Sequence, residues 1–307
     1  MDVRLPVAHT PLGNLAGVTM APGGVDAHLS RLNRPVVVFR GIPYALAPTG
    51  PLRFAPPVPA APWSGMRMAD QFGPMAPQVP GLLESMLDGG SVAVDEDNCL
   101  TLNVWTPACD HGYRPVMVWI HGGAFLTGGG AVSWYDGTRF ANEGNVVVVT
   151  INYRLGVFGF LHLQDAPDSG TVGLADQMEA LRWVQNNIAA FGGDPHRVTV
   201  FGESAGAMSI GAMLGGRMGA CHAVEIPFVF DNVHQTGASQ FLGAAQHLEE
   251  LSAQMNQAWI RFAYGDAPHP QWPAEDESHQ VWRFHNDDTA GLVSDPYGSE
   301  RSCWHHS

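Results

Sequence analysis

Three nearly continuous apolar runs constrain the fold of this chain more than any other feature. They are rich in valine and span residues 116–120, 146–151 and 198–201. Strands that are buried on both faces of a largely parallel sheet have this pattern, whereas strands with one face in water alternate apolar and polar residues. Two further runs, residues 36–39 and 101–105, also indicate strands. We therefore expect a central, mostly parallel sheet.

A helical pattern lies between the apolar runs at residues 146–151 and 198–201. Apolar residues recur there at three- and four-residue spacing until Gly192-Gly193, at Leu174, Met178, Leu181, Val184 and Ile188. A second such stripe ends before Gly265 and consists of Leu248, Leu251, Met255, Trp259 and Phe262. Strand, helix and strand in succession form a βαβ unit. We therefore assign the chain to the α/β class, as one domain over residues 1–307 with helices flanking the sheet.

Composition narrows the range of partners. The chain has 307 residues, 45% of them hydrophobic, which is enough for a large buried core. Its formal charge of -14 repels nucleic-acid phosphates and anionic lipid surfaces. Its apolar runs stay well below the ~20 residues that span a bilayer, and its first residues lack the pattern of a secretion signal. We expect a cytoplasmic protein that binds neither nucleic acid nor membranes.

Cysteine and histidine give no sign of a metal centre or a disulfide framework. Cys99, Cys109, Cys221 and Cys303 lie far apart, without a Cys-x-x-Cys pair, so we interpret them as free thiols. Two adjacent histidines stand near the end of the chain, where such side chains make poor ligands without partners. No metal is expected.

The sequence Phe-Gly-Glu-Ser-Ala-Gly at residues 201–206 joins the third apolar run to a stretch of small and apolar residues that can form a helix. A Gly-x-Ser-x-Gly between a strand and a helix is typical of the nucleophile elbow, a strained turn that exposes the serine above the sheet. Its glycines allow close approach of the backbone, and the helix N-terminus offers free N–H groups. Ser204 is therefore the candidate nucleophile.

Several blocks in a fixed order resemble one known family. They are residues 39–44 with 51–54, 99–105, 119–125, 152–156, 192–206 and 219–227. Together they are similar to the type-B carboxylesterases of the α/β-hydrolase fold, which include cholinesterases and bacterial p-nitrobenzyl esterases. The resemblance implies a serine carboxylesterase that hydrolyses small-molecule carboxylic esters through an acyl-enzyme and needs no cofactor.

The resemblance also implies roles within the site. Ser204 attacks the ester, and His222 takes its proton, since a serine hydroxyl is unreactive at neutral pH without a base. The backbone N–H groups of Gly123, Ala124 and Ala205 form the oxyanion hole. The alternative for residues 121–124 is a plain turn after a strand.

Gly122, Phe125 and Glu203 are expected to line the pocket. Glu203 either favours a nearby cation or imidazolium, or only forms a hydrogen bond within the pocket wall. The stretch 75–97, rich in proline, glycine and acidic residues, is expected to be a surface loop that borders the site. Ala124 stands where the family usually has a third glycine, which resembles the esterases whose open pockets accept bulky and tertiary alcohol esters.

A long segment of the family is missing between the serine and histidine motifs, with the break near residues 215–219. Ser204 and His222 are only 18 positions apart (222 − 204). The later strands of the family's sheet lie in that segment, so we expect the strand at 198–201 to become a sheet edge. Such an edge favours a homodimer through strand pairing, or cover by the C-terminal helix.

The usual acid of the triad also belongs to the missing segment. Glu225, three residues after His222, either takes that role or forms a salt bridge or a rim carboxylate. Asp287, Asp288 and Asp295 are further carboxylates without positional support. The alternatives to an active esterase are therefore a non-catalytic binding protein of the same fold and a truncated product of low activity.

Overall fold

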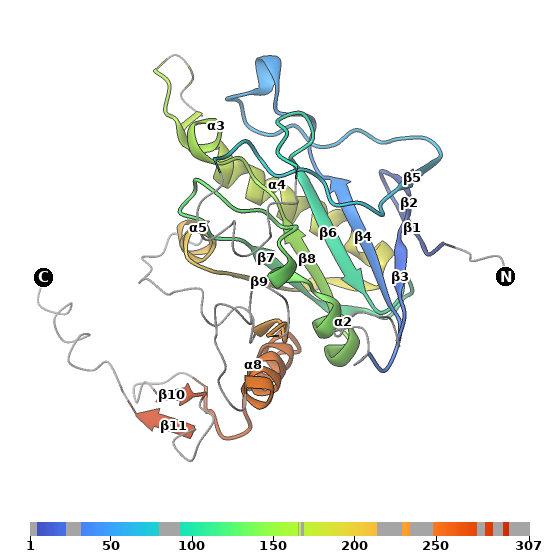
Figure 1. Cartoon of the computed structure of the whole chain (residues 1–307), viewed down its shortest axis with the longest axis vertical. Coiled ribbons are helices and arrows are strands. Elements are labelled where there is room, and N and C mark those ends of the chain that lie inside the picture. Colours follow the sequence, from blue (N-terminus) through green and yellow to red (C-terminus); the bar gives the residue numbers. More distant parts are fainter. Residues whose placement is uncertain are drawn as a thin grey trace, which may run out of the picture.

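The structure, a computed structural model, describes residues 5–22, 32–79, 93–164, 166, 169–213, 229–233, 248–274, 280–284 and 291–294. Its centre is a six-stranded sheet in the order β3-β4-β6-β8-β7-β9 (Figure 1). The strands are β3 (Val18–Met20), β4 (Val36–Pro43), β6 (Thr101–Thr106), β7 (Arg114–Ile120), β8 (Val147–Ile151) and β9 (Gly193–Gly202). Each of the five predicted runs coincides with one of these strands.

The sheet is mixed, so the prediction of a mostly parallel sheet is wrong. β7 is parallel to both β8 and β9, whereas β3, β4, β6 and β8 pair with one another antiparallel. A parallel pair needs a long crossover, usually a helix. In the described part of the chain, α-helices connect only the last three strands of this sheet, through α2 (Thr138–Gly144) and then α3 (Gly156–Phe160) and α4 (Val172–Asn187). The prediction holds for those three strands alone.

Alternate residues of the central strands build two separate cores. Val116, Val118 and Ile120 of β7 share a cluster with residues of α4. Met117 and Trp119 share a second cluster with residues of α2 and of the C-terminal helix α8 (Leu248–Ala263). In Figure 1, α4 lies behind the sheet, and α2 and α8 lie in front. Because helices cover both faces, the strands between them have no polar face, which explains the continuous apolar runs.

The predicted helices are present, but the apolar stripe predicted between residues 174 and 188 is not wholly buried. Met178 is 43% exposed, while Asp176 and Gln177 are fully buried. Asp176 can be buried because Arg154 donates three hydrogen bonds to its carboxylate, at 2.7 Å from Nε, 2.6 Å from Nη2 and 3.0 Å from the backbone N–H. The turn after α4 ends at Gly192, with a φ of +76°.

β9 forms the edge of the sheet, as predicted. β7 pairs with one side of β9, and no other described strand pairs with its opposite side. Its residues are mostly half-buried, whereas those of β7 are all buried. Helix α8 covers one face of β9: the Trp259 ring lies 5.2 Å from the Phe201 ring.

Two small sheets were not predicted. One consists of β1 (Val7–Thr10), β2 (Gly13–Ala16) and β5 (Met66–Met68), and the other is the hairpin of β10 (Gln280–Arg283) and β11 (Gly291–Ser294). Strands of three or four residues are too short for a clear periodic signal. None of the described helices is long and apolar enough to cross a membrane. The assignment of one domain stays a prediction.

Residues 229–233 pack against the central sheet. Phe230 is fully buried, and three aromatic rings lie 5.1, 5.2 and 5.6 Å from its own, those of Trp119, Phe140 and Phe201. The next residue, Asp231, accepts hydrogen bonds from Nε (2.8 Å) and Nη2 (2.6 Å) of Arg139 in α2. An apolar anchor and an ion pair thus fix this short segment to the front face of the sheet.

Candidate active site

Ser204 occupies a strained turn between β9 and α5 (Ala205–Met213). Its φ of +50° lies in the left-handed region, which residues other than glycine rarely adopt. The N–H of Gly206 closes the turn by donating to the carbonyl of Glu203 at 2.8 Å. The Ser204 side chain is half-buried. This is the backbone geometry expected of a nucleophile elbow.

The glycines on either side of Ser204 allow the turn to lie against the end of β7. A Cβ at Gly202 would lie 2.7 Å from the carbonyl oxygen of Ile120, and one at Gly206 would overlap the carbonyl oxygens of Ile120 and His121. Any larger residue would push the turn away. Because Ile120 also pairs with Gly202 in the sheet, the loop after β7 begins beside the serine.

The loop after β7 has an unusual backbone. Gly123, Ala124 and Phe125 have φ values of +95°, +54° and +63°. Two of the three are not glycine, so the loop carries strain that the surrounding contacts must offset. The carbonyl of Gly123 accepts hydrogen bonds from the N–H groups of Leu126 (2.9 Å) and Thr127 (3.0 Å). A tight, fixed turn therefore contains two of the predicted oxyanion donors.

Gly122 brings this loop into contact with the serine turn. A Cβ at Gly122 would overlap the Glu203 carboxylate and lie 3.0 Å from the Glu203 carbonyl oxygen. Burial and, to a lesser extent, the negative charge of Glu203 raise the pKa of Tyr153 above its usual range. The structure thus brings Gly122 and Glu203 together beside Ser204, while a role of Glu203 toward a cation stays a prediction.

His121 and Tyr153 support the loop after β7, which contains the predicted oxyanion donors, and the sequence analysis missed both. Nδ1 of His121 lies 2.9 Å from the carbonyl oxygen of Gly122. The Tyr153 ring stacks on the imidazole at 4.4 Å between centroids, and its hydroxyl donates to the carbonyl of His121 at 2.8 Å. Both side chains are buried. The signal that could have found them is their place in two of the blocks that resemble the family.

The stretch 75–97 borders the same loop through its described residues. The Gln78 amide donates from Nε2 to the carbonyl of Gly128 (2.8 Å) and accepts the Gly128 N–H at Oε1 (2.7 Å). Residues 80–92 lie outside the described part of the chain.

The base and the acid of the predicted triad stay predictions. His222 and Glu225 lie outside the described residues, and so do Asp287, Asp288 and Asp295. Within the described ranges, no group of three or more His, Cys, Asp or Glu side chains could hold a metal ion.

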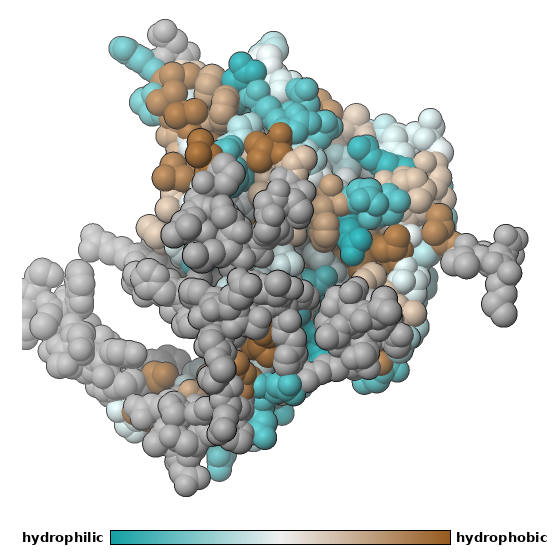
Figure 2. Space-filling view, viewed as in Figure 1, coloured by the Kyte–Doolittle hydropathy of each residue, from teal (hydrophilic) through white to brown (hydrophobic). Residues whose placement is uncertain are grey.

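Apolar side chains lie beside the oxyanion loop. Leu126 and Val157 are 60% and 56% exposed, and the ring of Phe125 packs on that of Phe160 at 4.9 Å between centroids. Figure 2 shows apolar surface gathered where α3 lies. A surface of this kind suits esters with hydrophobic groups.

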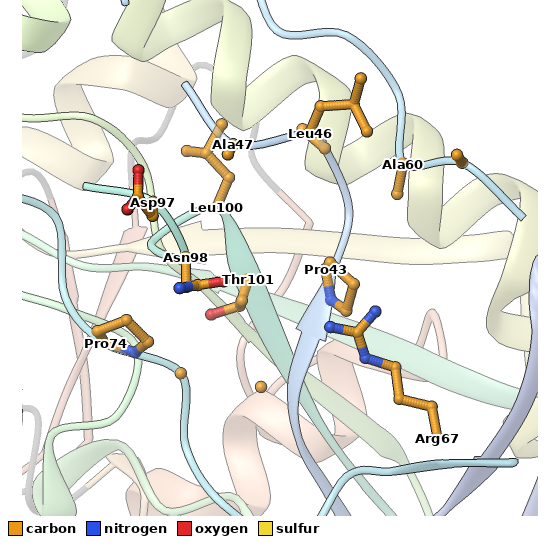
Figure 3. Close-up of a pocket in the computed structure, with 14 residues that line it drawn as sticks. Pro43, Leu46, Ala47, Ala60, Arg67, Pro74, Asp97, Asn98, Leu100 and Thr101 are labelled. Carbon is orange, nitrogen blue, oxygen red and sulfur yellow. The ribbon is translucent and has the colours of Figure 1, made fainter. Parts of the chain in front are cut away.

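A separate cavity of about 290 Å³ lies between β4 and the start of β6. Its polar groups come from Arg67, Asp97, Asn98 and Thr101, which Figure 3 shows on opposite walls. None of the predicted site residues is among its described lining residues. This cavity is therefore distinct from the Ser204 region.

Comparison with known proteins shows the family to which residues 5–217 belong. The model described as "Carboxylesterase family" matches residues 5–217. Phenmedipham hydrolase from Pseudarthrobacter oxydans is 47% identical over 213 residues, 69% of this chain and 40% of that protein. Para-nitrobenzyl esterase from Bacillus subtilis is 49% identical over 178 residues, 57% of this chain and 36% of that protein. A solved carboxylesterase from Geobacillus stearothermophilus superposes with a TM-score of 0.80 at 28% identity, over 97% of this chain and 99% of that chain.

The matches cover only part of each curated relative. The chain spans about 40% of the length of the curated relatives it matches. The family match ends at residue 217, and the break near 215–219 stays a prediction. On this evidence the chain belongs to the type-B carboxylesterase family of the α/β-hydrolase fold.

Proposed function

We propose that this chain hydrolyses carboxylic esters through an acyl-enzyme. Ser204 attacks the ester carbonyl while His222 takes the hydroxyl proton, and the N–H groups of Gly123, Ala124 and Ala205 stabilise the oxyanion. His222 then gives the proton to the leaving alcohol. A water molecule, activated by the same imidazole, attacks the acyl-enzyme and releases the carboxylic acid.

The strained backbone of Ser204 is the observation that carries this proposal. A φ of +50° at a residue other than glycine persists only where its surroundings hold it, and such strain concentrates at active sites. The carbonyl of Ser204 accepts the N–H of Met208 at 2.9 Å. That carbonyl and the Ala205 N–H belong to one planar peptide group, so this helical hydrogen bond also fixes the direction of the proposed donor. Ala205 begins α5, where N–H groups have no partner within the helix.

Residues 229–233 support His222 as the base. The ring of Phe230 lies 5.1 Å from that of Trp119 and 5.6 Å from that of Phe201, which is three residues before Ser204. Eight positions separate His222 from Phe230 (230 − 222), a length of at most ~26 Å of extended chain. The chain between His222 and the anchored Phe230 is therefore long enough for His222 to reach Ser204.

Glu225 is our candidate for the acid, and a salt bridge or rim carboxylate is its alternative. Loss of the acid from a serine triad lowers kcat by about 10⁴, while residual hydrolysis survives. Glu225→Gln separates the two roles. A fall of that size supports the acid, and a rate near that of the parent supports the alternative.

We propose that bulky and tertiary alcohol esters are among the substrates. Ala124 replaces the usual third glycine, and its side chain is exposed, as are the apolar side chains of Leu126 and Val157. Hydrolysis of tert-butyl acetate or linalyl acetate tests this specificity. Cleavage of primary acetates, with both tertiary esters untouched at high enzyme load, would contradict it.

A fluorophosphonate probe tests the nucleophile directly. The parent should be labelled, and mass spectrometry should find the adduct on Ser204. Ser204→Ala should abolish labelling, whereas the matched control Ser64→Ala, at an exposed serine, should not. A well-folded parent that is not labelled would show that the esterase proposal is wrong, and partner binding that persists in Ser204→Ala would then favour a binding protein.

No described strand pairs with the outer edge of β9, which leads us to propose a homodimer through this strand. An edge with open N–H and C=O groups pairs readily with a second chain. Light scattering across a range of concentrations measures the mass in solution. A monomer at every concentration would exclude this arrangement.

A further inference from the structure

We infer that Gln78 is a positioning residue for the oxyanion hole, an inference that rests on the proposed function. The peptide group is planar and trans, so its C=O and N–H point in opposite directions. A hydrogen bond that fixes the carbonyl therefore fixes the direction of the N–H. The proposed donor of Ala124 shares its peptide group with the carbonyl of Gly123. The hydrogen bonds that hold the Gly123 carbonyl therefore fix the direction of the Ala124 N–H.

The turn at residues 126–127 holds that carbonyl. It accepts the N–H of Leu126 at 2.9 Å, the N–H of Thr127 at 3.0 Å and the Thr127 hydroxyl at 3.3 Å. All three donors come from two consecutive residues. The aim of the Ala124 N–H thus depends on where Leu126 and Thr127 lie.

Gln78 fixes the residue that follows this turn. Its Nε2 donates to the carbonyl of Gly128 at 2.8 Å, and its Oε1 accepts the Gly128 N–H at 2.7 Å. The Gly128 N–H belongs to the same peptide group as the carbonyl of Thr127, so the amide holds the peptide groups on both sides of Gly128. Gly128 itself has a φ of +106°, and a Cβ there would lie 2.5 Å from Nδ1 of His121. Gln78 therefore holds the turn against His121.

Gln78 is itself anchored by its own segment. Its Nε2 also donates to the carbonyl of Ala76 at 3.1 Å. Met75 pairs through its N–H with the carbonyl of Ala93 at 2.8 Å, and its side chain is so close to Gly129 that a Cβ there would lie 2.7 Å from Cγ. The amide of Gln78 is thus presented from a fixed segment, which a positioning residue requires.

The other end of the loop is held independently. The N–H of Gly130 donates to Oδ1 of Asn152 at 2.7 Å, and its carbonyl accepts from the hydroxyl of Thr150 at 2.6 Å and Nδ2 of Asn103 at 3.2 Å. Loss of the Gln78 amide therefore releases both peptide groups of Gly128, and with them the position of Thr127, while Gly130 stays in place. The effect is expected on catalysis rather than on the fold.

Gln78→Met, which keeps the length of the side chain and removes both hydrogen bonds to Gly128 together with the one to Ala76, tests this inference. Gln71→Met, at an exposed glutamine of the preceding segment, is the matched control. We measure kcat and KM for p-nitrophenyl acetate, and the affinity for a trifluoromethyl ketone that adds to the serine as an oxyanion. We expect kcat to fall about tenfold or more, below the 10²–10³ caused by loss of a whole donor. KM should stay close to that of the parent, and ketone affinity should fall by the same factor as kcat/KM.

The outcomes separate the inference from the proposed function. Parent-like kcat/KM and ketone affinity in folded Gln78→Met would overturn the role of Gln78 and leave the esterase intact. A parent that neither hydrolyses esters nor reacts with the fluorophosphonate would overturn the proposed function itself. If Gln78→Met does not fold, Thr127→Val, which removes one hydroxyl on the same path, takes its place. The same loss of ketone affinity would then support the inference, and unchanged affinity would overturn it.

Discussion

Phe230→Ala would remove the ring that joins residues 229–233 to the sheet. The side chain is fully buried, with the rings of Trp119, Phe140 and Phe201 within 5.6 Å. Truncation of a buried phenylalanine costs about 3–5 kcal/mol, because a cavity term adds to the lost transfer free energy. Rigid aromatic neighbours cannot close that cavity, so we expect the upper half of this range. Total stabilities are about 5–15 kcal/mol, so the change is a large share.

Urea denaturation followed by tryptophan fluorescence measures this loss. With a slope of about 3 kcal/mol per molar urea, a loss of about 4–5 kcal/mol lowers the midpoint by roughly 1.5 M. The matched control is Phe262→Ala, whose side chain is 52% exposed on α8. A surface change of this kind stays within about 0.5 kcal/mol, or roughly 0.2 M. Equal midpoints for the two variants would refute the packing argument.

Two further predictions concern buried charges and thiols. Asp231→Asn removes the carboxylate charge that pairs with the buried Arg139 guanidinium, so we expect a loss of stability approaching the about 3–5 kcal/mol of a broken buried pair; Asp231→Asn combined with Arg139→Met should lose less than the sum of the single variants in urea denaturation. Burial raises the pKa of Cys99 and of Cys109 to about 12, so at pH 8 only about one thiol in 10⁴ is the reactive thiolate. Both should resist a thiol reagent until the protein unfolds, and rapid modification of either one in the native state, mapped by mass spectrometry, would contradict this.

The elements that could be predicted from sequence are those whose signal is local. β7, β8 and β9 were predictable because helices cover both of their faces, which leaves continuous apolar runs. β4 and β6 were also predicted as strands, but their antiparallel direction was not predictable, since it depends on pairing between distant segments. Likewise, nothing in the periodicity of α4 encodes the burial of Asp176, because its partner Arg154 lies 22 residues earlier.

The candidate site divides in the same way. Ser204 was predictable because the nucleophile, its glycines, the strand and the helix are contiguous in sequence. Gln78 was not, because its partner Gly128 is 50 residues away and a glutamine in a proline-rich stretch has no distinguishing pattern. The role that we propose for it depends on the hydrogen bonds that join it to Gly128 and on those that join residues 126–127 to Gly123.

The two halves of the proposed site depend on different parts of the chain. The serine turn and the oxyanion loop follow neighbouring strands, and both lie within residues 5–217 that match the family. The proposed base comes after residue 217. An oxyanion hole and substrate binding alone give about 10³–10⁴-fold acceleration over water when triad members are lost. The serine turn and the loop after β7 therefore set a minimum rate of hydrolysis. His222 with its acid determines how far the rate of the parent exceeds that minimum. The ratio of parent kcat to that of His222→Ala measures that excess: about 10⁴ or more means an assembled triad, and a ratio near one means that the oxyanion hole acts alone.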